Sequence, residues 1–181
     1  MADIIVREAH AGDVAGIARV HVESSRAAHA GLLPAETFAV FTFERRLATW
    51  AETLAGGDEF VYVAEEDGRV VGFASGGAER AGDAEFDGEL YTVYVLPARQ
   101  RLGAGRLLTL AVAERLAAEG FGALLLWVLE GNKPARRFYE SLGGALVRRK
   151  QEERAGRASA EVGYGWPDLK GFCERIRAGL R

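Results

Sequence analysis

The sequence predicts an α/β protein in which helices flank a mixed, mostly antiparallel sheet. Short segments rich in valine, leucine and tyrosine, typical of strands, alternate with longer segments that have the apolar spacing of helices. A helical pattern at 103–119 separates the strand patterns at 89–96 and 123–129, and this order indicates one parallel pair joined by a helix. Glycine accounts for 23 of the 181 residues, which indicates many turns and close backbone contacts.

The N-terminal half of the chain is predicted to form a strand, two helices and a hairpin. Asp13 is a good N-cap and precedes apolar residues at helical spacing. Asp67 and Gly68 are a strong turn signal between two strand patterns. In chain order the expected elements are a strand at 4–7, a helix from Asp13 to a break at 31–34, a helix at 35–54 with core positions Phe38, Phe41, Leu47, Trp50 and Leu54, and strands at 60–64 and 69–75.

The C-terminal half is predicted to continue the sheet and to end in a helix. The all-apolar segment at 123–129 is typical of a strand covered on both faces. No repeat or linker divides the chain, so we expect a single domain at 1–165, with a tail helix at 166–181 as part of it. The expected elements are strands at 89–96, 123–129, 145–151 and 160–164, and helices at 103–119, 135–142 and 168–178.

The composition is that of an ordinary globular protein, with 49% apolar and 27% charged residues. The longest apolar run is the segment at 123–129, whereas a membrane span needs about 20 residues. We therefore expect a cytoplasmic protein with no membrane segment. The net charge of −3 argues against a nucleic-acid partner, which usually requires a basic excess. One cysteine, and histidines without metal-ligand spacing, predict neither a disulfide within the chain nor a metal site.

A loop with a phosphate-binding pattern, Q-R-L-G-A-G at 100–105, follows a predicted strand and opens a predicted helix. Helix N-termini present unpaired N–H groups and the positive end of the helix dipole, so they bind phosphates. Gly103 and Gly105 carry no side chain that would block a close approach. Positive charge around the same turn comes from Arg99, Arg101 and Arg106. The pattern therefore predicts a pyrophosphate ligand.

Two common phosphate-binding motifs do not match this loop. A dinucleotide-binding fold needs a third glycine where Leu108 stands, and an acidic residue about 20 positions further on, near Ala123. A P-loop needs Gly-Lys followed by Ser or Thr, which is absent. The loop instead has glutamine at 100 and glycine at 103 and 105.

This pattern resembles the signature of the GNAT superfamily of acyl-CoA-dependent N-acyltransferases, Q/R-x-x-G-x-G/A between a strand and a long helix. Gln100, Gly103 and Gly105 match it, and the segment at 132–143 looks like the second half of the family's pattern. The resemblance implies an N-acetyltransferase whose sheet is splayed open between two strands, with acetyl-CoA in the opening. Backbone N–H groups at 101–106 would hold its pyrophosphate. The residues that the resemblance implies for cofactor binding are Val93, Val95, Gln100, Arg101, Leu102, Gly103, Ala104, Gly105, Arg106, Asn132 and Arg136.

The reaction implied by this resemblance needs both a proton acceptor and a proton donor. An alkyl ammonium has a pKa of about 10.4 and must lose a proton before the nitrogen can attack a thioester. We expect Glu89 to accept that proton, directly or through water, and to face the same side as Tyr91, Val93 and Val95 by strand alternation. The leaving thiolate needs a proton, and the resemblance assigns Tyr139 as its donor.

Each of these assignments has a structural alternative. Tyr139 suits core packing, Asn132 suits a turn, and Glu89 suits a solvated strand end. The expected acceptor is a primary amine of a small molecule or peptide. The resemblance places its pocket near Arg26, His29, Leu33 and Tyr91. The acidic residues at 79–89 form either a rim that attracts a cation or an ordinary solvated loop.

Two other functional interpretations stay open from the sequence. A non-catalytic acyl-CoA-binding sensor or partner-binding module of the same fold would bind the cofactor without transferring an acyl group. A nucleotide-binding protein that uses the same glycine loop would bind NAD or ATP in preference to CoA. A homodimer is a further expectation, since dimers are common in the superfamily.

Overall fold

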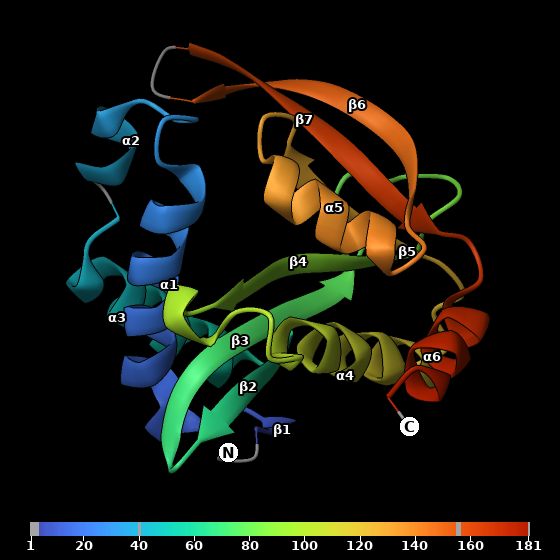
Figure 1. The fold of residues 1–181 in the computed structure, drawn as a ribbon, viewed down its shortest axis with the longest axis horizontal. Coiled ribbons are helices and arrows are strands. Elements are labelled where there is room, and N and C mark those ends of the chain that lie inside the picture. Colours follow the sequence, from blue (N-terminus) through green and yellow to red (C-terminus); the bar gives the residue numbers. More distant parts are fainter. Residues whose placement is uncertain (1–3, 40, 155–156, 181) are drawn as a thin grey trace.

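The computed structural model describes residues 4–39, 41–154 and 157–180. A seven-stranded sheet with the order β1-β2-β3-β4-β5-β7-β6 crosses the molecule. All neighbouring strands run antiparallel except β4 and β5, which are parallel. The predicted fold class, a mixed and mostly antiparallel sheet flanked by helices, is confirmed (Figure 1).

The observed elements follow the predicted order, with several longer strands. The strands are β1 (Ile5–Glu8), β2 (Phe60–Glu66), β3 (Arg69–Ala78), β4 (Gly88–Val95), β5 (Leu124–Leu129), β6 (Ala145–Arg154) and β7 (Arg157–Trp166). The helices are α1 (Val14–His29), α2 (Ala35–Ala39), α3 (Phe43–Gly56), α4 (Ala104–Ala118), α5 (Lys133–Ser141) and α6 (Leu169–Ala178), with short 3₁₀ turns at Ala11–Asp13 and Pro97–Arg99. The strands β6 and β7 pair along most of their length, which accounts for their extension beyond the predicted ends.

The predicted helix at 35–54 is in fact two helices, α2 and α3. Thr42 has an extended backbone, and its hydroxyl accepts a hydrogen bond from the Arg45 N–H at 3.3 Å. A threonine that caps a new helix prevents the preceding one from continuing through it. Of the five predicted core positions in this region, only Trp50 is buried, and Leu47 is 36% exposed.

Asp13 precedes α1 as predicted, but its side chain does not cap the helix. The carboxylate instead accepts hydrogen bonds from Arg7 at 2.7 and 2.8 Å, and Arg7 also contacts Glu65 of β2. Asp13 thus forms an ion pair instead of the predicted cap, and this ion pair joins the start of α1 to β1 and β2.

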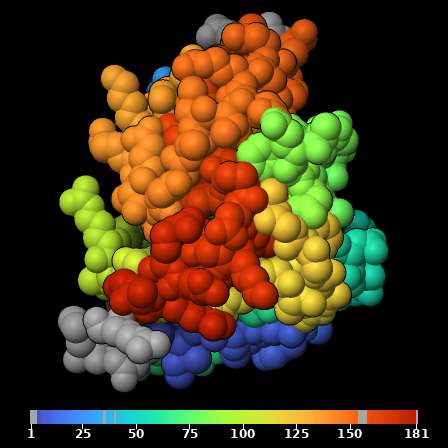
Figure 2. Space-filling view, turned by 90° about the vertical axis from the view of Figure 1, so that its right-hand side faces the viewer, coloured from blue at the N-terminus to red at the C-terminus, as the bar shows by residue number. Residues whose placement is uncertain are grey.

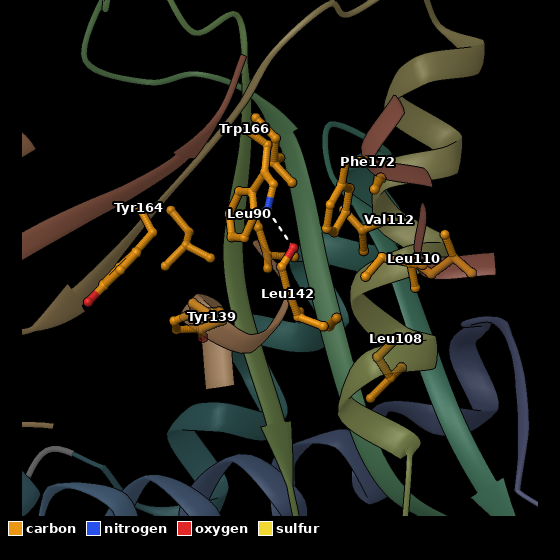
Figure 3. Close-up of a cluster of buried hydrophobic side chains, with 14 of the residues drawn as sticks. Leu90, Leu108, Leu110, Val112, Tyr139, Leu142, Tyr164, Trp166 and Phe172 are labelled. Carbon is orange, nitrogen blue, oxygen red and sulfur yellow. Dashed lines mark hydrogen bonds between the residues drawn. The ribbon is translucent and has the colours of Figure 1, made fainter. Parts of the chain in front are cut away.

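The two faces of the sheet are covered by different helices, and we call them the α1 face and the α4 face. On the α1 face, Ile17 and Trp50 from α1 and α3 pack against Phe73 of β3. On the α4 face, α4, α5 and α6 share one larger core with the central strands. Figure 3 shows part of this core, including the hydrogen bond from the Trp166 indole to the Leu142 carbonyl. Figure 2 shows α6 lying on the outside of this layer.

The parallel strands β4 and β5 stay paired at two positions only, Gly88 with Leu124 and Glu89 with Leu125. Beyond this point, which we call the fork, β5 is paired with β7 on its other side while β4 is paired with β3. The predicted splaying between the strand patterns at 89–96 and 123–129 therefore occurs, and it begins after Glu89.

An aromatic cluster on the α1 face holds a half-buried histidine. The His21 ring lies 5.2 Å from the Tyr94 ring and 5.4 Å from the Phe73 ring, between centroids. The Trp50 indole N–H donates to His21 Nδ1 at 3.0 Å, so His21 accepts there as a neutral imidazole. Burial, assisted by the charges of Arg46 and His29, lowers the pKa of His21 from 6.5 to about 4.

We predict that His21 makes the fold acid-sensitive. The unfolded chain takes up a proton near pH 6.5 and the folded chain only near pH 4, so stability falls as the pH is lowered through this window. The expected loss is about 3 kcal/mol over the whole shift, of which about 2 kcal/mol falls between pH 7 and pH 4.5. Urea unfolding of the wild type and His21→Gln at pH 7 and pH 4.5 measures it. Glutamine keeps an acceptor for Trp50 without titrating, so the variant should lose less stability on acidification; an equal loss would contradict the assignment.

Candidate active site

A β-bulge follows the fork on β4. Gly76 of β3 is paired with Leu90, whereas Ser75 is paired with Thr92, so Tyr91 is an extra residue on β4. A bulge of this kind shifts the alternation of side chains by one position. Before it, Leu90 points to the α4 face, and after it Val93 does.

The bulge separates residues that the sequence placed on one face. Val93 and Val95 pack into the core of the α4 face. Glu89 is paired with Gly77, and a Cβ on Gly77 would come within 2.6 Å of the Tyr91 hydroxyl, which places Glu89 and Tyr91 together on the α1 face. The prediction that Glu89 faces the same side as Val93 and Val95 is therefore wrong, because strand alternation does not hold across a bulge.

Beyond the bulge, the edge of β4 that faces β5 presents backbone groups. The Leu96 N–H donates to the Val71 carbonyl of β3 at 2.9 Å. Because successive residues point to opposite edges of a strand, the N–H and C=O groups of Val95 and Val93 point to the opposite, open edge. The Gln100 side chain donates to the Val95 carbonyl there at 3.1 Å. The predicted glutamine thus ties the phosphate-binding loop to this edge.

The N-terminus of α4 has the geometry of an anion site. Gly103 precedes the helix with a φ of 92°, a conformation that suits glycine, and Arg101 before it has a φ of 65°. The first backbone bond into the helix runs from the Leu107 N–H to the Gly103 carbonyl. The N–H groups of residues 104–106 consequently precede the helical bonding pattern and are available to a ligand.

Some residues around this helix end lie at the loop, and others bind elsewhere in the chain. A Cβ on Gly105 would lie 3.3 Å from the Phe138 ring of α5, so the glycine permits α5 to approach. Leu102 is 53% exposed beside it. Arg106 points away from the loop and donates to the Ile176 carbonyl of α6 at 3.2 Å, while Arg99 is paired with Glu66. The predicted positive charge at the turn is thus left mainly to Arg101.

The two predicted cofactor residues in the C-terminal half make structural contacts. Asn132 is buried, and its side-chain oxygen accepts from the Ala135 N–H at 3.2 Å as the N-cap of α5. Arg136 donates to the Tyr164 hydroxyl at 3.1 Å and to the Glu130 carbonyl at 3.0 Å. Asn132 therefore begins α5, and Arg136 fixes the helix against β7 and the end of β5.

Tyr139 of α5 is buried in the core of the α4 face, where its ring lies 6.2 Å from the Tyr164 ring (Figure 3). Burial raises the pKa of its phenol well above the usual range, and the nearby Tyr94 adds to this. The phenol therefore stays protonated at neutral pH. Among the described residues, its hydroxyl has no hydrogen-bond partner, which leaves its proton available to a bound molecule.

Glu89 is buried and forms an ion pair at the fork. Its carboxylate accepts three hydrogen bonds from Arg80, namely from the backbone N–H and Nε at 3.2 Å and from Nη2 at 2.6 Å. The guanidinium also stacks on Tyr91, 3.8 Å from the ring centroid, and the Tyr91 hydroxyl donates to the Ala78 carbonyl at 2.6 Å. This arrangement gives the carboxylate a single orientation on the α1 face.

The acidic residues at 79–87 are engaged in hydrogen bonds and ion pairs within the chain. Glu79 accepts from two backbone N–H groups, and Asp87 accepts from those of Gly122 and Ala123. Arg148 binds Asp83 at 2.8 Å and lowers the pKa of that carboxyl, and it also contacts Glu85. These contacts hold the segment in place over the sheet.

A cavity of about 330 Å³ lies where α1 meets the end of β5. It is bordered by residues 31–34, 129–131 and 158–160, including the predicted Leu33. His29 lies at the start of this loop, with its ring 6.3 Å from that of Tyr94, while Arg26 donates to the Phe41 carbonyl at 3.3 Å. Tyr91 lies at the fork instead, beneath Arg80, so the structure does not gather all four predicted acceptor residues around one cavity.

Sequence reasoning missed Tyr94 and Arg80. Tyr94 lies on the α1 face beside the open edge of β4, in contact with His21 and His29, and its field reaches Tyr139. Nothing in the sequence marks Tyr94. Strand alternation counted from Glu89 assigns its side chain to the opposite face of the sheet, because the count does not include the bulge. The only signal for Arg80 was its isolation among five carboxylates.

The comparisons with known proteins agree with this geometry. The model of the acetyltransferase (GNAT) family matches residues 26–144. The chain belongs to this family. It is 39% identical over 167 residues to YuaI of Bacillus subtilis, described as an uncharacterised N-acetyltransferase, and the match covers 92% of this chain and 94% of the relative. The family resemblance that the sequence suggested is thus confirmed, and the chain is an acyl-CoA-dependent N-acetyltransferase.

More distant relatives and solved structures extend this likeness. The mycothiol acetyltransferase of Thermomonospora curvata is 43% identical over 83 residues, which cover 46% of this chain but only 27% of that protein. YncA of Salmonella typhimurium, solved with acetyl-CoA, has a TM-score of 0.70 at 24% identity and covers 93% of this chain and 95% of its own. PaiA of Thermoplasma acidophilum, solved with coenzyme A, has a TM-score of 0.67 at 20% identity, covering 88% and 98%. These two structures show the shared fold. The expected cofactor, acetyl-CoA, is confirmed for the family.

Within the described residues, no helix is long and apolar enough to cross a membrane. No group of three histidine, cysteine or acidic side chains within those ranges is arranged to hold a metal ion.

Proposed function

We propose that this enzyme transfers an acetyl group directly to the primary amine of a small molecule or peptide while both substrates are bound. The observation that carries the proposal is the two-sided fork. The free N–H groups of α4 and the backbone edge at Val93 and Val95 lie on one side of it. Glu89 and Tyr91 lie on the α1 face. Two molecules can therefore approach the fork from opposite faces.

The residues present fit acetyl-CoA. Its pyrophosphate suits the N-terminus of α4, because unpaired N–H groups and the helix dipole both favour an anion there. Its pantetheine arm carries amides, which suit the free backbone N–H and C=O groups of Val93 and the N–H of Val95. Gly103 and Gly105 keep side chains out of this path. Acetyl-CoA supplies an activated thioester, and the remaining chemistry belongs to the chain.

Tyr139 is proposed as the proton donor to the sulfur. Its phenol is protonated at neutral pH because burial raises its pKa, and its hydroxyl has no other described partner. The rings of Phe138 and Tyr164 pack near the Tyr139 ring, at 5.3 and 6.2 Å between centroids. A rigidly held phenol can transfer a proton without reorganising its surroundings.

Glu89 is proposed as the proton acceptor for the amine, acting through water. The bulge places its carboxylate on the α1 face, which is the side left for the acceptor substrate. Arg80 occupies much of the carboxylate, so direct contact with the amine is less suited than a water-mediated route. The backbone N–H of Val95 at the open edge can polarise the thioester carbonyl, as donors in an oxyanion hole do.

The alternative, a non-catalytic acyl-CoA-binding module, would bind the cofactor without acyl transfer, and the presence of Tyr139 is an argument against it. The primary amine as acceptor, a homodimer and a cytoplasmic location stay predictions from the sequence. The finer domain division at 166 has the same status, although α6 contributes Leu169, Phe172 and Ile176 to the main core.

Thermal melting with acetyl-CoA, CoA, NAD and ATP in parallel tests the cofactor site. A ligand at about 100 times its Kd stabilises the native state by about 2.7 kcal/mol, which corresponds to a rise in Tm of roughly 5 to 10 °C for a chain of this size. We expect this rise with the two CoA compounds alone. No rise with CoA, or a larger rise with NAD or ATP, would overturn the proposal.

We predict that Tyr139→Phe lowers kcat by roughly 10- to 1000-fold, the range of a lost general acid. Phenylalanine keeps the buried ring, so the Tm should change little and the KM for acetyl-CoA should stay the same. Steady-state kinetics that follow thiol release with a panel of primary amines measure both constants. Turnover equal to the wild type would remove Tyr139 from the mechanism.

We predict that Glu89→Gln lowers kcat and moves the acidic limb of the pH–rate profile, because glutamine cannot accept the proton. The expected loss at pH 7 is roughly 100-fold. Glu85→Gln is the matched control, since its side chain belongs to the same segment but is 70% exposed and lies away from the fork. An unaltered profile in Glu89→Gln would point to another base or to bulk water.

A further inference from the structure

The cavity of about 330 Å³ at the end of β5 runs along the backbone of a strand. Its lining includes three successive residues of β7, at 158–160. Because side chains of successive residues point to opposite faces of a sheet, a space bordered by all three lies beside the strand rather than over one face. The loop at 31–34, after α1, forms the opposite wall. The cavity therefore lies at an open edge of β7, on the side of α1.

This edge is open because β7 extends past the end of β5 toward α2 (Figure 1). Their pairing ends with the hydrogen bond from the Glu130 N–H to the Ala160 carbonyl at 2.9 Å, after which the chain turns into α5. Backbone groups two residues apart point to the same edge of a strand, so the N–H and C=O of Ala158 point the same way as those of Ala160. Within the described residues, no strand lies there to pair with them. Ser159, which points to the other edge, is paired with Glu152 of β6.

The cavity lies level with the open backbone edge of β4. The parallel strands β4 and β5 are paired at Gly88 and Leu124. Five residues further along β5, Leu129 borders the cavity. The same count along β4 leads to Val93, or to Tyr94 when the extra residue of the bulge is included. An amine held at the cavity therefore lies across the opening from the part of β4 to which the thioester is assigned in the proposed function.

The lining of the cavity suits an amide better than a carboxylate. Glu130 is its charged side chain, and no cationic side chain is among the described residues that border it. Arg149, outside the lining, is paired with Glu130. A carboxylate next to the amine, as in a free amino acid, would therefore lack a partner and lie near a like charge. Leu32 and Leu33 add apolar surface, and Leu32 is 40% exposed.

We propose that the acceptor is a short peptide whose second residue pairs with Ala158 as a continuation of β5. That residue would donate its N–H to the Ala158 carbonyl and accept from the Ala158 N–H, as opposite residues of antiparallel strands do. A peptide that runs in the direction of β5 has its amino end toward Glu130, and hence toward the opening. Main-chain hydrogen bonds to an open strand edge are an established way to bind a peptide. The inference rests on the proposed function and narrows its acceptor to an α-amino group followed by an amide.

The first part of the test changes the acceptor and leaves the protein intact. It compares alanyl-alanine amide with two analogues that each lack one of the two hydrogen bonds to Ala158. In the matched ester, oxygen replaces the N–H between the two residues, and alaninamide lacks the second carbonyl. All three carry an α-amino group next to a carbonyl, so their amines are similarly basic. We expect kcat/KM, measured by thiol release, to be roughly 10-fold lower for each analogue, the range of one lost hydrogen bond.

The second part compares two proline variants of the hairpin formed by β6 and β7. Ala158→Pro removes the N–H that points into the cavity and leaves the ladder to β6 intact, because that ladder uses the other edge of β7. It should lower kcat/KM for alanyl-alanine amide roughly 10-fold, with alaninamide turnover and the KM for acetyl-CoA unchanged. Gln151→Pro is the matched control, since Gln151 is paired with Ala160 and its N–H points to the outer edge of β6. It should keep the wild-type preference for the dipeptide amide.

Any of four results would overturn the inference. Equal kcat/KM for the three acceptors would show that the edge binds no second residue. Acetylation of alkylamines but of none of these acceptors would show a different substrate class. An equal loss for the dipeptide amide and alaninamide in Ala158→Pro, with a lower Tm, would show a structural role. The same loss of preference in Gln151→Pro would show a general effect on the hairpin. If the wild type bound CoA but acetylated no amine at all, the proposed function itself would fail.

Discussion

The structure depends on one interruption of hydrogen bonding, the parting of β4 from β5 after Glu89 and Leu125. A central strand normally satisfies both of its edges, and buried backbone groups left unpaired are costly. Here the edge at Val93 and Val95 is left for a ligand. The cost is tolerated because the core on the α4 face, built from α4, α5 and α6 together, still joins the two parts of the sheet.

The bulge at Tyr91 turns this open edge into a site with two chemically different sides. Without the extra residue, Glu89 would share a face with Val93, and one side of the fork would hold both the cofactor and the base. With it, the backbone edge accompanies the α4 N-terminus, and the carboxylate faces α1. In the proposed function, a substrate that needs deprotonation thus has its own approach, separate from that of the thioester.

Two partly exposed arginine side chains near β4 are fixed by ion pairs and ring contacts. Arg80 is 59% exposed along its side chain, yet Glu89 binds it and Tyr91 lies beneath it. Arg148 does the same for the acidic segment before β4. Such ion pairs fix orientation more than they add stability. Rigid orientation is what a proton path requires, since each hydrogen bond must be in place before the proton moves.

The sequence by itself determined the fold class, the order of the elements and the phosphate-binding loop, because periodicity, glycine placement and helix-end chemistry are local properties. It also singled out Tyr139 and Glu89. Only the tertiary structure decided which way Glu89 faces, since a bulge depends on pairing with β3. The sequence also could not predict which groups these side chains contact. Arg106 binds α6, and Asn132 caps α5. The same side chains could have met a ligand, and only the packing of distant segments settles which contact a side chain makes.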